Sequence, residues 1–203
     1  HDFFPETKKR GYLGMIISRH YLPMFPTRAE AKARVLPDTL FVVGQGLKEP
    51  IKEFYPELSV QTAPAFRFQG VYRKFQKKKA ISNLTVLITL YSILEEAVMA
   101  IKFALATNLL LENDFSIQWQ IKPHSLTNKH NLLSAMELPL PDNCKWLDND
   151  FHESLDYVDV LMGSASSTCM EAIARGKYVI IIGNPHGITH NPIPSSVPNE
   201  LWK

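Results

Sequence analysis

A regular alternation of short apolar runs and helix-forming segments, between residues 83 and 182, constrains the fold most strongly. The apolar runs predict five strands, at Leu84–Leu90, Ser116–Ile121, Cys144–Leu147, Val158–Met162 and Tyr178–Ile182. The segments between them predict helices, at about Ile93–Leu105, Asn128–Met136, His152–Tyr157 and Ser167–Arg175. Strands that alternate with helices through short connections favour a parallel sheet with helices on both faces. We therefore predict an α/β fold for this part of the chain.

The first 72 residues carry a weaker form of the same pattern. Apolar runs bounded by Gly, Pro or Asp predict strands at Leu13–Ile17, Thr39–Val43 and Leu58–Thr62. Short helices are expected at about Arg28–Arg34 and Gln45–Phe54. The chain opens on His1 rather than on an initiator Met. We expect residues 1–72 to be the C-terminal part of an α/β domain whose beginning lies outside this sequence.

A basic run separates the two parts of the chain. Residues 73–79 read Arg-Lys-Phe-Gln-Lys-Lys-Lys, and such a block either contacts phosphates or an anionic membrane or forms a solvated linker. We favour the linker, because charge blocks are usually exposed. The predicted organisation is an incomplete domain over residues 1–72, a linker over 73–82 and a second domain over 83–203.

The composition narrows the classes of partner and compartment. Lys and Arg total 22 against 20 Asp and Glu, and this balance gives no case for specific nucleic-acid binding. Cys144 and Cys169 have neither metal-ligand spacing nor the density of a disulfide scaffold, and His186 and His190 lack a third ligand. No apolar stretch is long enough to span a membrane. We expect a cytoplasmic protein without a metal, and the alternative interpretation of the basic run leaves peripheral association with the inner face of the plasma membrane open.

Two polar segments follow predicted strands at what would be one edge of the second sheet. Ligands of open parallel sheets bind beyond the carboxyl ends of the strands. The first segment contains Lys122 and His124, which are candidate donors to an anion. The second contains the hydroxyl residues Ser164, Ser166, Ser167 and Thr168 at the start of a predicted helix. We predict that this edge binds phosphate through the hydroxyls and the open amides of the helix.

Ordinary helix capping explains the second segment equally well. Thr168 and Glu171 have the spacing of a capping box, and capping uses the same amides as anion binding. The GxxxxGK[ST], GxGxxG and GxSxG motifs are absent. Outside this edge, His20 follows a predicted strand and could supply a base or an anion contact, and Arg67 is a candidate for stacking at a domain interface.

Residues 114–185 resemble the second half of GT-B glycosyltransferases, especially those of bacterial surface-carbohydrate and capsule biosynthesis. The matching parts are Ile121-Lys122-Pro123-His124, the serine-rich turn that runs into Glu171-Ala172 and Gly176, and the apolar strand after it. Residues 11–72 resemble more faintly the end of the acceptor-side domain in the same enzymes. The resemblance implies two Rossmann-like domains, with the first incomplete.

The resemblance also implies an activity and roles for residues. A nucleotide-sugar donor would lie in the cleft, its phosphates held by Lys122, His124 and the serines, with Glu171 reaching the ribose. His20 would be the candidate catalytic base, the acceptor would be a glycan or a lipid-linked molecule, and no metal or other cofactor would be required. Other activities stay open: a sugar-nucleotide 2-epimerase, a CDP-glycerol polyol-phosphate transferase, or a non-catalytic module that binds a nucleotide or a partner protein.

Overall fold

The computed structural model describes residues 7–72, 83–111, 116–136, 139–164, 166–185 and 187–203. The predicted linker at 73–82 and His186 lie outside the described residues. The described chain forms two sheets, and every strand pairing in both is parallel. The α/β fold predicted from the sequence is confirmed, whereas the domain limits at 72 and 83 stay predictions.

The first sheet has three strands in the order β1-β2-β3. Its strands are β1 (Arg10–Leu13), β2 (Thr39–Val43) and β3 (Ser59–Ala63). Its helices are α1 (Arg28–Lys32) and α2 (Lys48–Phe54), with single 3-10 turns at η1 (Leu22–Met24) and η2 (Gln45–Leu47). Thr27 and Glu30 cap α1 reciprocally, and Ile51 of α2 is fully buried in a core with Val42 and Phe25.

The second sheet has five strands in the order β6-β5-β4-β7-β8. Its strands are β4 (Asn83–Thr89), β5 (Ser116–Lys122), β6 (Cys144–Trp146), β7 (Val160–Gly163) and β8 (Tyr178–Ile181). The elements that accompany it are α3 (Leu94–Leu111), α4 (Lys129–Met136), α5 (Phe151–Asp156), α6 (Ser167–Ala174) and the 3-10 turn η4 (Asn199–Leu201).

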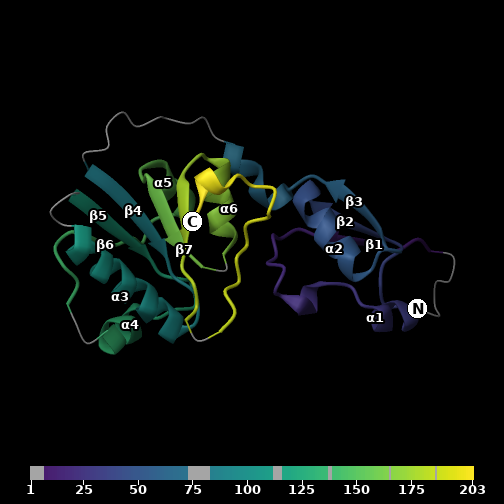
Figure 1. The fold of residues 1–203 in the computed structure, drawn as a ribbon, viewed down its shortest axis with the longest axis horizontal. Helices are drawn as coiled ribbons and strands as arrows, with labels where there is room; N and C mark the ends of the chain where they lie inside the picture. Colours follow the sequence, from purple (N-terminus) through teal and green to yellow (C-terminus); the bar gives the residue numbers. More distant parts are fainter. Residues whose placement is uncertain (1–6, 73–82, 112–115, 137–138, 165, 186) are drawn as a thin grey trace.

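Helices cover both faces of the second sheet (Figure 1). Val86 and Ile88 of β4 are buried in one cluster with residues of α3 and α4, whereas Leu87 is buried in another with residues of α5 and α6. Successive residues of a strand point to opposite faces, so one strand supplies both cores. This two-sided burial is why β4 contains a continuous apolar run from Val86 to Ile88.

The segment that leads out of the first sheet contacts helix α6 of the second. This segment, η3 (Phe66–Tyr72), buries Phe68 and Val71 in the core of the first sheet. Its Gly70 carbonyl accepts a 3.0 Å hydrogen bond from Arg175, the residue that caps the C-terminus of α6. Arg175 is 2% exposed and also donates to the His152 carbonyl and to Asp156 of α5. One buried guanidinium therefore holds three segments together.

The first predicted strand is misplaced. The sequence predicts a strand at Leu13–Ile17, but β1 ends at Leu13 and pairs with β2 from Arg10↔Thr39 to Leu13↔Val42. Ile17 is buried in the core of the first sheet although it lies in the loop that follows β1. Burial alone produced the apolar signal there, because a loop that packs inward is as apolar as a strand.

Candidate functional site

The order of the second sheet reverses between β4 and β7. From β4 the chain builds β5 and β6 on one side and then returns to place β7 and β8 on the other. At such a point the loops that follow the two central strands diverge and leave a crevice at their carboxyl ends. The last residues of those strands are Thr89 and Gly163. The serine-rich turn predicted to bind phosphate follows Gly163 directly.

Gly163 allows the turn to approach β4 closely. A Cβ at this position would lie 2.7 Å from Oγ1 of Thr89 and 3.3 Å from Sγ of Cys169. With no side chain there, Thr168 Oγ1 lies 3.3 Å from Thr89 Oγ1 and donates to Ser166 Oγ at 2.9 Å. The result is a connected set of hydroxyls at the switch point, from Thr89 through Thr168 to Ser166.

The start of α6 differs from the predicted capping box. Its N-cap is Ser166, whose hydroxyl accepts from the amide of Thr168 at 3.3 Å, so Thr168 and Glu171 do not form the reciprocal cap. The amide of Cys169 bonds the Ser166 carbonyl. The Ser167 amide meets no acceptor among the described residues, so the first turn keeps an open donor at the positive end of the helix.

Glu171 is buried one turn farther along α6. The residue is 7% exposed, and its Oε2 lies 3.6 Å from Nδ1 of His152 on α5. Burial raises the pKa of Glu171, while the charges of His152, Arg67 and Arg175 and a hydrogen bond from Ser167 oppose that rise. That Glu171 reaches a ribose stays a prediction. The structure gives the carboxylate a neighbour, His152, which the sequence did not predict.

Lys122 is the last residue of β5, and His124 follows that strand at the same edge of the sheet. Lys122 donates to the Asn149 carbonyl in the loop before α5. Nδ1 of His124 accepts from the amide of Leu126 at 3.2 Å. Because an amide can only donate, the neutral ring of His124 carries its proton on Nε2. His124 is therefore set up as a hydrogen-bond donor, as phosphate binding requires.

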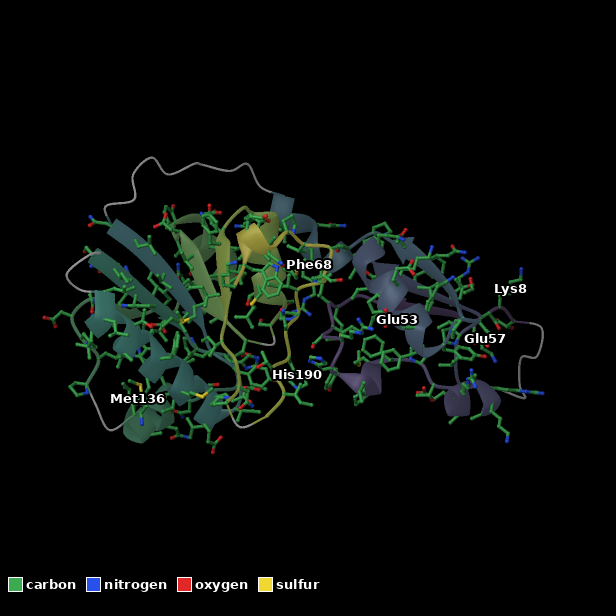
Figure 2. The ribbon with its side chains drawn as sticks, viewed as in Figure 1. Lys8, Glu53, Glu57, Phe68, Met136 and His190 are labelled. Carbon is green, nitrogen blue, oxygen red and sulfur yellow. The ribbon has the colours of Figure 1, made fainter. Side chains whose placement is uncertain are left out.

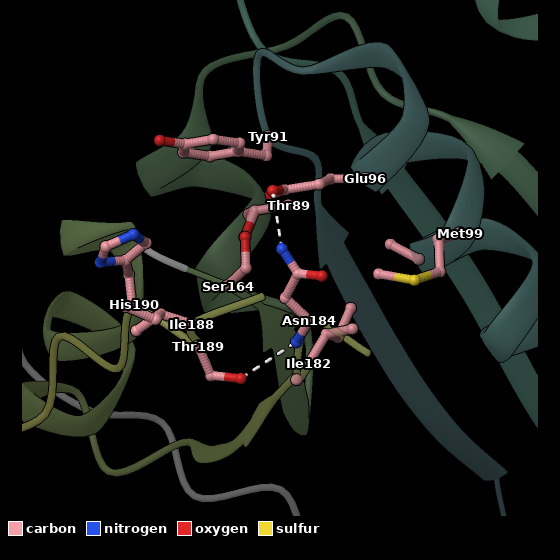
Figure 3. A pocket seen from close by; sticks show the side chains of 12 residues that line it. Thr89, Tyr91, Glu96, Met99, Ser164, Ile182, Asn184, Ile188, Thr189 and His190 are labelled. Carbon is pink, nitrogen blue, oxygen red and sulfur yellow. Dashed lines mark hydrogen bonds between the residues drawn. The ribbon is translucent and has the colours of Figure 1, made fainter. Parts of the chain in front are cut away.

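A small cavity of about 30 Å³ lies at the switch point (Figure 3). Its wall includes Thr89, Ser164, Glu96, Asn184 and His190. Asn184 Nδ2 donates to Glu96 Oε1 at 3.3 Å, and Nδ1 of His190 is buried without a partner in the described chain. The volume suffices for one or two waters and not for a nucleotide.

A second cavity, of about 680 Å³, lies between the two sheets. It is lined by residues that follow β1, by η2 and α2, and by the C-terminal segment from Asn191 to Trp202. Figure 1 shows this segment in yellow on the side of the second sheet that faces the first, and Figure 2 shows Glu53 and His190 on the two halves. The volume lies within the range of small-molecule sites.

His20 lines this second cavity and contacts the second half of the chain. Its Nδ1 lies 3.1 Å from the Thr189 carbonyl, and the neighbouring Tyr21 ring meets His190 edge-on at 6.3 Å. Because a carbonyl can only accept, Nδ1 carries the proton and Nε2 of the neutral ring keeps a lone pair. The ring of His20 is therefore in the tautomer that a general base needs.

The structure separates the predicted site residues into three places. Ser164 lines the cavity at the switch point, and Thr168 joins Ser166 to Thr89 beside it. Ser167 bonds Glu171, and Glu171 and Lys122 contact α5 and the loop before it, with His124 just after Lys122. His20 lies at the cavity between the sheets. Thr89 and the segment Asn191–Ser196 were not predicted. Thr89 could have been predicted as a site residue, because its hydroxyl stands near the end of a predicted strand. The proline- and asparagine-rich segment has no pattern that would have predicted its position.

Neither a metal centre nor a membrane span emerges from the described part of the chain. No three His, Cys, Asp or Glu residues there gather as metal ligands. None of the helices in the described ranges is long and apolar enough to cross a bilayer. Burial raises the pKa of Cys144 to about 11 and that of Cys169 to about 12, so neither thiol is an activated nucleophile.

Comparison with known proteins gives the fold. No protein-family model matches the chain, and no curated protein matches it significantly. The chain is similar to the solved structure of TarM, with a TM-score of 0.50 and 14% identity over 90% of this chain and 38% of TarM.

Two further structures are similar at lower scores. CalG4, the calicheamicin glycosyltransferase, has a TM-score of 0.46 and 14% identity over 79% of this chain and 37% of its own. KpsC of Thermosulfurimonas dismutans, a β Kdo 2,4 transferase, has a TM-score of 0.35 and 16% identity over 51% and 35%. The chain spans little more than a third of each of these proteins. At this identity the likeness to TarM shows a shared α/β, Rossmann-like fold and nothing finer.

Proposed function

We propose that this chain is the donor-binding part of a glycosyltransferase, acting on a nucleotide sugar in the synthesis of a surface polysaccharide or related glycan. The observation that supports this most directly is the hydroxyl-rich start of α6 at the switch point between β4 and β7. Thr168 joins Thr89 to Ser166 there, and Ser164 lines the same cavity as Thr89, beside the open amide of Ser167. Phosphate oxygens accept from such hydroxyls and amides, and the helix dipole favours their charge.

The remaining residues have complementary roles in this proposal. Nε2–H of His124 and the ammonium of Lys122 donate to the donor phosphates, and Glu171 accepts from the ribose hydroxyls. These protein donors stabilise the charge that develops on the departing nucleotide phosphate, so no metal is required. The protein works in the cytoplasm, at the inner face of the membrane where such glycans are assembled.

His20 is the base in the proposed reaction. The acceptor hydroxyl oxygen forms a bond to the anomeric carbon of the donor sugar while the bond from that carbon to the phosphate oxygen breaks. The proton of the hydroxyl passes to Nε2 of His20, and the nucleotide leaves with the bonding electron pair. The hydrogen bond to the Thr189 carbonyl keeps the imidazole in the required tautomer and stabilises the imidazolium that forms.

A thermal-shift panel of CMP, CDP, UDP, GDP and ADP tests nucleotide binding. At about 100 times its dissociation constant, a bound nucleotide adds about 2.7 kcal/mol to the stability of the chain. The double variant Ser167→Ala, His124→Asn should lose most of that response, because it removes two donors while Asn still accepts from the Leu126 amide. The matched control Ser125→Ala, His130→Ala changes the same residue types nearby and should keep it.

Each outcome of this panel has a clear meaning. A response to one base that the double variant loses and the control keeps supports the proposal and names the donor class. No response to any nucleotide, or a response equal in all three proteins, contradicts the assignment of the phosphate site. His20→Ala should bind the nucleotide normally and lose transfer; normal transfer by that variant would exclude His20 as the base.

A further inference from the structure

The side chains that line the cavity between the two sheets indicate the chemical class of the acceptor, which the donor site does not. Its first wall consists of Ile17–His20 after β1, η2 after β2, and α2. Its second wall consists of Asn191–Ser196 together with Asn199 and Trp202. A ligand in this cavity would contact both halves of the chain, beside His20.

The charges of the lining do not suit an anionic ligand. Arg19 is the one Lys or Arg among the described residues that line the cavity, and its guanidinium is paired with the Glu53 carboxylate. Glu49 adds a second carboxylate to the same wall, so the lining has one more carboxylate than guanidinium. A diphosphate placed here would face Glu49 while the nearby cation is already engaged, and such a like-charge arrangement discriminates against it.

The uncharged polar groups of the lining suit a ligand rich in hydroxyls. Amides and hydroxyls come from both walls: Ser18, Gln45, Asn191, Ser195, Ser196 and Asn199. These groups both donate and accept, as sugar hydroxyls do, and the carboxylates of Glu49 and Glu53 accept from hydroxyls without needing a cation. Phe25, Leu47, Ile193 and Trp202 give the same cavity apolar surface for the carbon face of a sugar ring.

From these observations we propose that the cavity binds an uncharged carbohydrate as the acceptor, rather than a lipid diphosphate. This inference rests on the proposed transferase function, because only a transferase gives the bound carbohydrate the role of acceptor. The chemical class of the ligand follows from the lining alone. The volume of about 680 Å³ accommodates a sugar unit or two. His20, with its free Nε2 lone pair, is the lining residue suited to take the proton of a bound hydroxyl.

Saturation-transfer NMR on the full chain tests this proposal. The probes are uncharged disaccharides of glucose, galactose, mannose, rhamnose, N-acetylglucosamine and N-acetylgalactosamine, with farnesyl diphosphate as the short lipid diphosphate. We expect transfer to at least one disaccharide. In the Ser167→Ala, His124→Asn variant, which lacks two donors of the proposed phosphate site, we expect none to farnesyl diphosphate. Transfer to farnesyl diphosphate alone, or to no disaccharide, overturns the proposal.

Two variants locate the binding and test the role of charge. Ser196→Trp places an indole in the cavity and should reduce the disaccharide signal at least fivefold, whereas Ser125→Trp, outside the cavity, should leave it unchanged. Glu49→Arg, added to the Ser167→Ala, His124→Asn variant, reverses the unpaired charge and should create a farnesyl diphosphate signal. A disaccharide signal that survives Ser196→Trp places the sugar elsewhere and overturns the assignment.

The outcome is separable from that of the nucleotide panel. If the chain binds no nucleotide but binds a disaccharide, and Ser196→Trp abolishes that binding, the carbohydrate site is supported and the transferase function is contradicted. A nucleotide response without disaccharide binding would keep the donor site and contradict this cavity assignment.

Discussion

The carboxyl group of Glu171 is buried, and burial disfavours its ionised form. It is 7% exposed on α6, and burial raises its pKa despite His152 at 3.6 Å. A carboxyl whose folded pKa lies above its unfolded value contributes stability below the unfolded pKa and loses it as the pH rises through the folded value. At neutral pH the ionised side chain therefore destabilises the fold. A residue kept under that penalty is a candidate for function.

We predict that Glu171→Gln stabilises the chain at pH 7 and not at pH 4. The amide removes the buried charge at neutral pH, and at pH 4 the native carboxyl already carries its proton. Thermal unfolding at the two pH values should show a rise of a few degrees at pH 7 that shrinks toward zero at pH 4. A variant that is equally destabilised at both pH values would show that Glu171 is chiefly a structural partner of His152. Nucleotide affinity should fall in the same variant.

Individual residues show how far sequence reasoning reached. The hydroxyls of the turn were predicted as a group because they follow a strand, and Ser164, Ser166 and Thr168 do line the switch point or bond within it. The partners of Glu171 were not predictable. His152 lies 19 positions earlier in the chain, and only the packing of α5 beside α6 brings the two side chains together.

At the scale of elements, α5 depends on one cap. Asp150 accepts from the amide of His152 at 2.7 Å, and that hydrogen bond is the main reason why the pKa of Asp150 is lowered. The helix has only six residues, Phe151–Asp156, and it carries His152 to Glu171 and Asp156 to Arg175. The position of two contacts near the proposed site therefore depends on the cap of a short helix.

We predict that Asp150→Ala costs about 1 kcal/mol of stability, whereas Asp150→Asn, which keeps the acceptor, costs much less. Urea unfolding at pH 7 measures both. A lowered pKa contributes stability above the unfolded value of an aspartate, and this contribution is lost as the pH falls through the folded value. The difference between the wild type and Asp150→Asn should therefore shrink in acid. Equal losses for both variants would contradict the cap.

Elements buried on both faces were the easiest to predict. The strands β4 and β7 lie close to their predicted positions because their buried residues form continuous apolar runs. The strand β5 does so because the buried Ile117, Trp119 and Ile121 alternate with polar residues. The misplaced first strand lies at the edge of the smaller sheet, where β1 alternates in exposure and the buried Ile17 lies in a loop. Periodicity reports burial, and strands at an edge are poorly buried.

At the scale of the whole molecule, the large cavity had no signature in the sequence. Its walls come from residues 17–53 and 191–202, which are distant in the chain and belong to different halves. The segment Asn191–Ser196 reads as a plain loop, and its part in the cavity follows only from its course between the sheets (Figure 1). Chemistry shared between two halves of a chain cannot be read from either half alone.

We predict that Arg175→Met loosens the two halves from each other. The variant leaves the carbonyls of Gly70 and His152 without their donor and should cost about 2 to 3 kcal/mol in urea unfolding. Arg28→Met, on an exposed helix of the first half, serves as the matched control and should change little. Scanning calorimetry should then show one transition for the wild type and two for Arg175→Met. A single, unshifted transition would mean that Arg175 does not join the halves.

The separation of the cores also orders events during synthesis. The core of the first sheet is built from residues between Ile17 and Val71, and those of the second from residues between Val86 and Ile193. As the chain leaves the ribosome, the first half can bury its apolar side chains before the second is translated. Arg175 and the segment that closes the cavity are made after the whole of the first core. The nascent chain therefore acquires the core of its first sheet before the cavity that the two halves share.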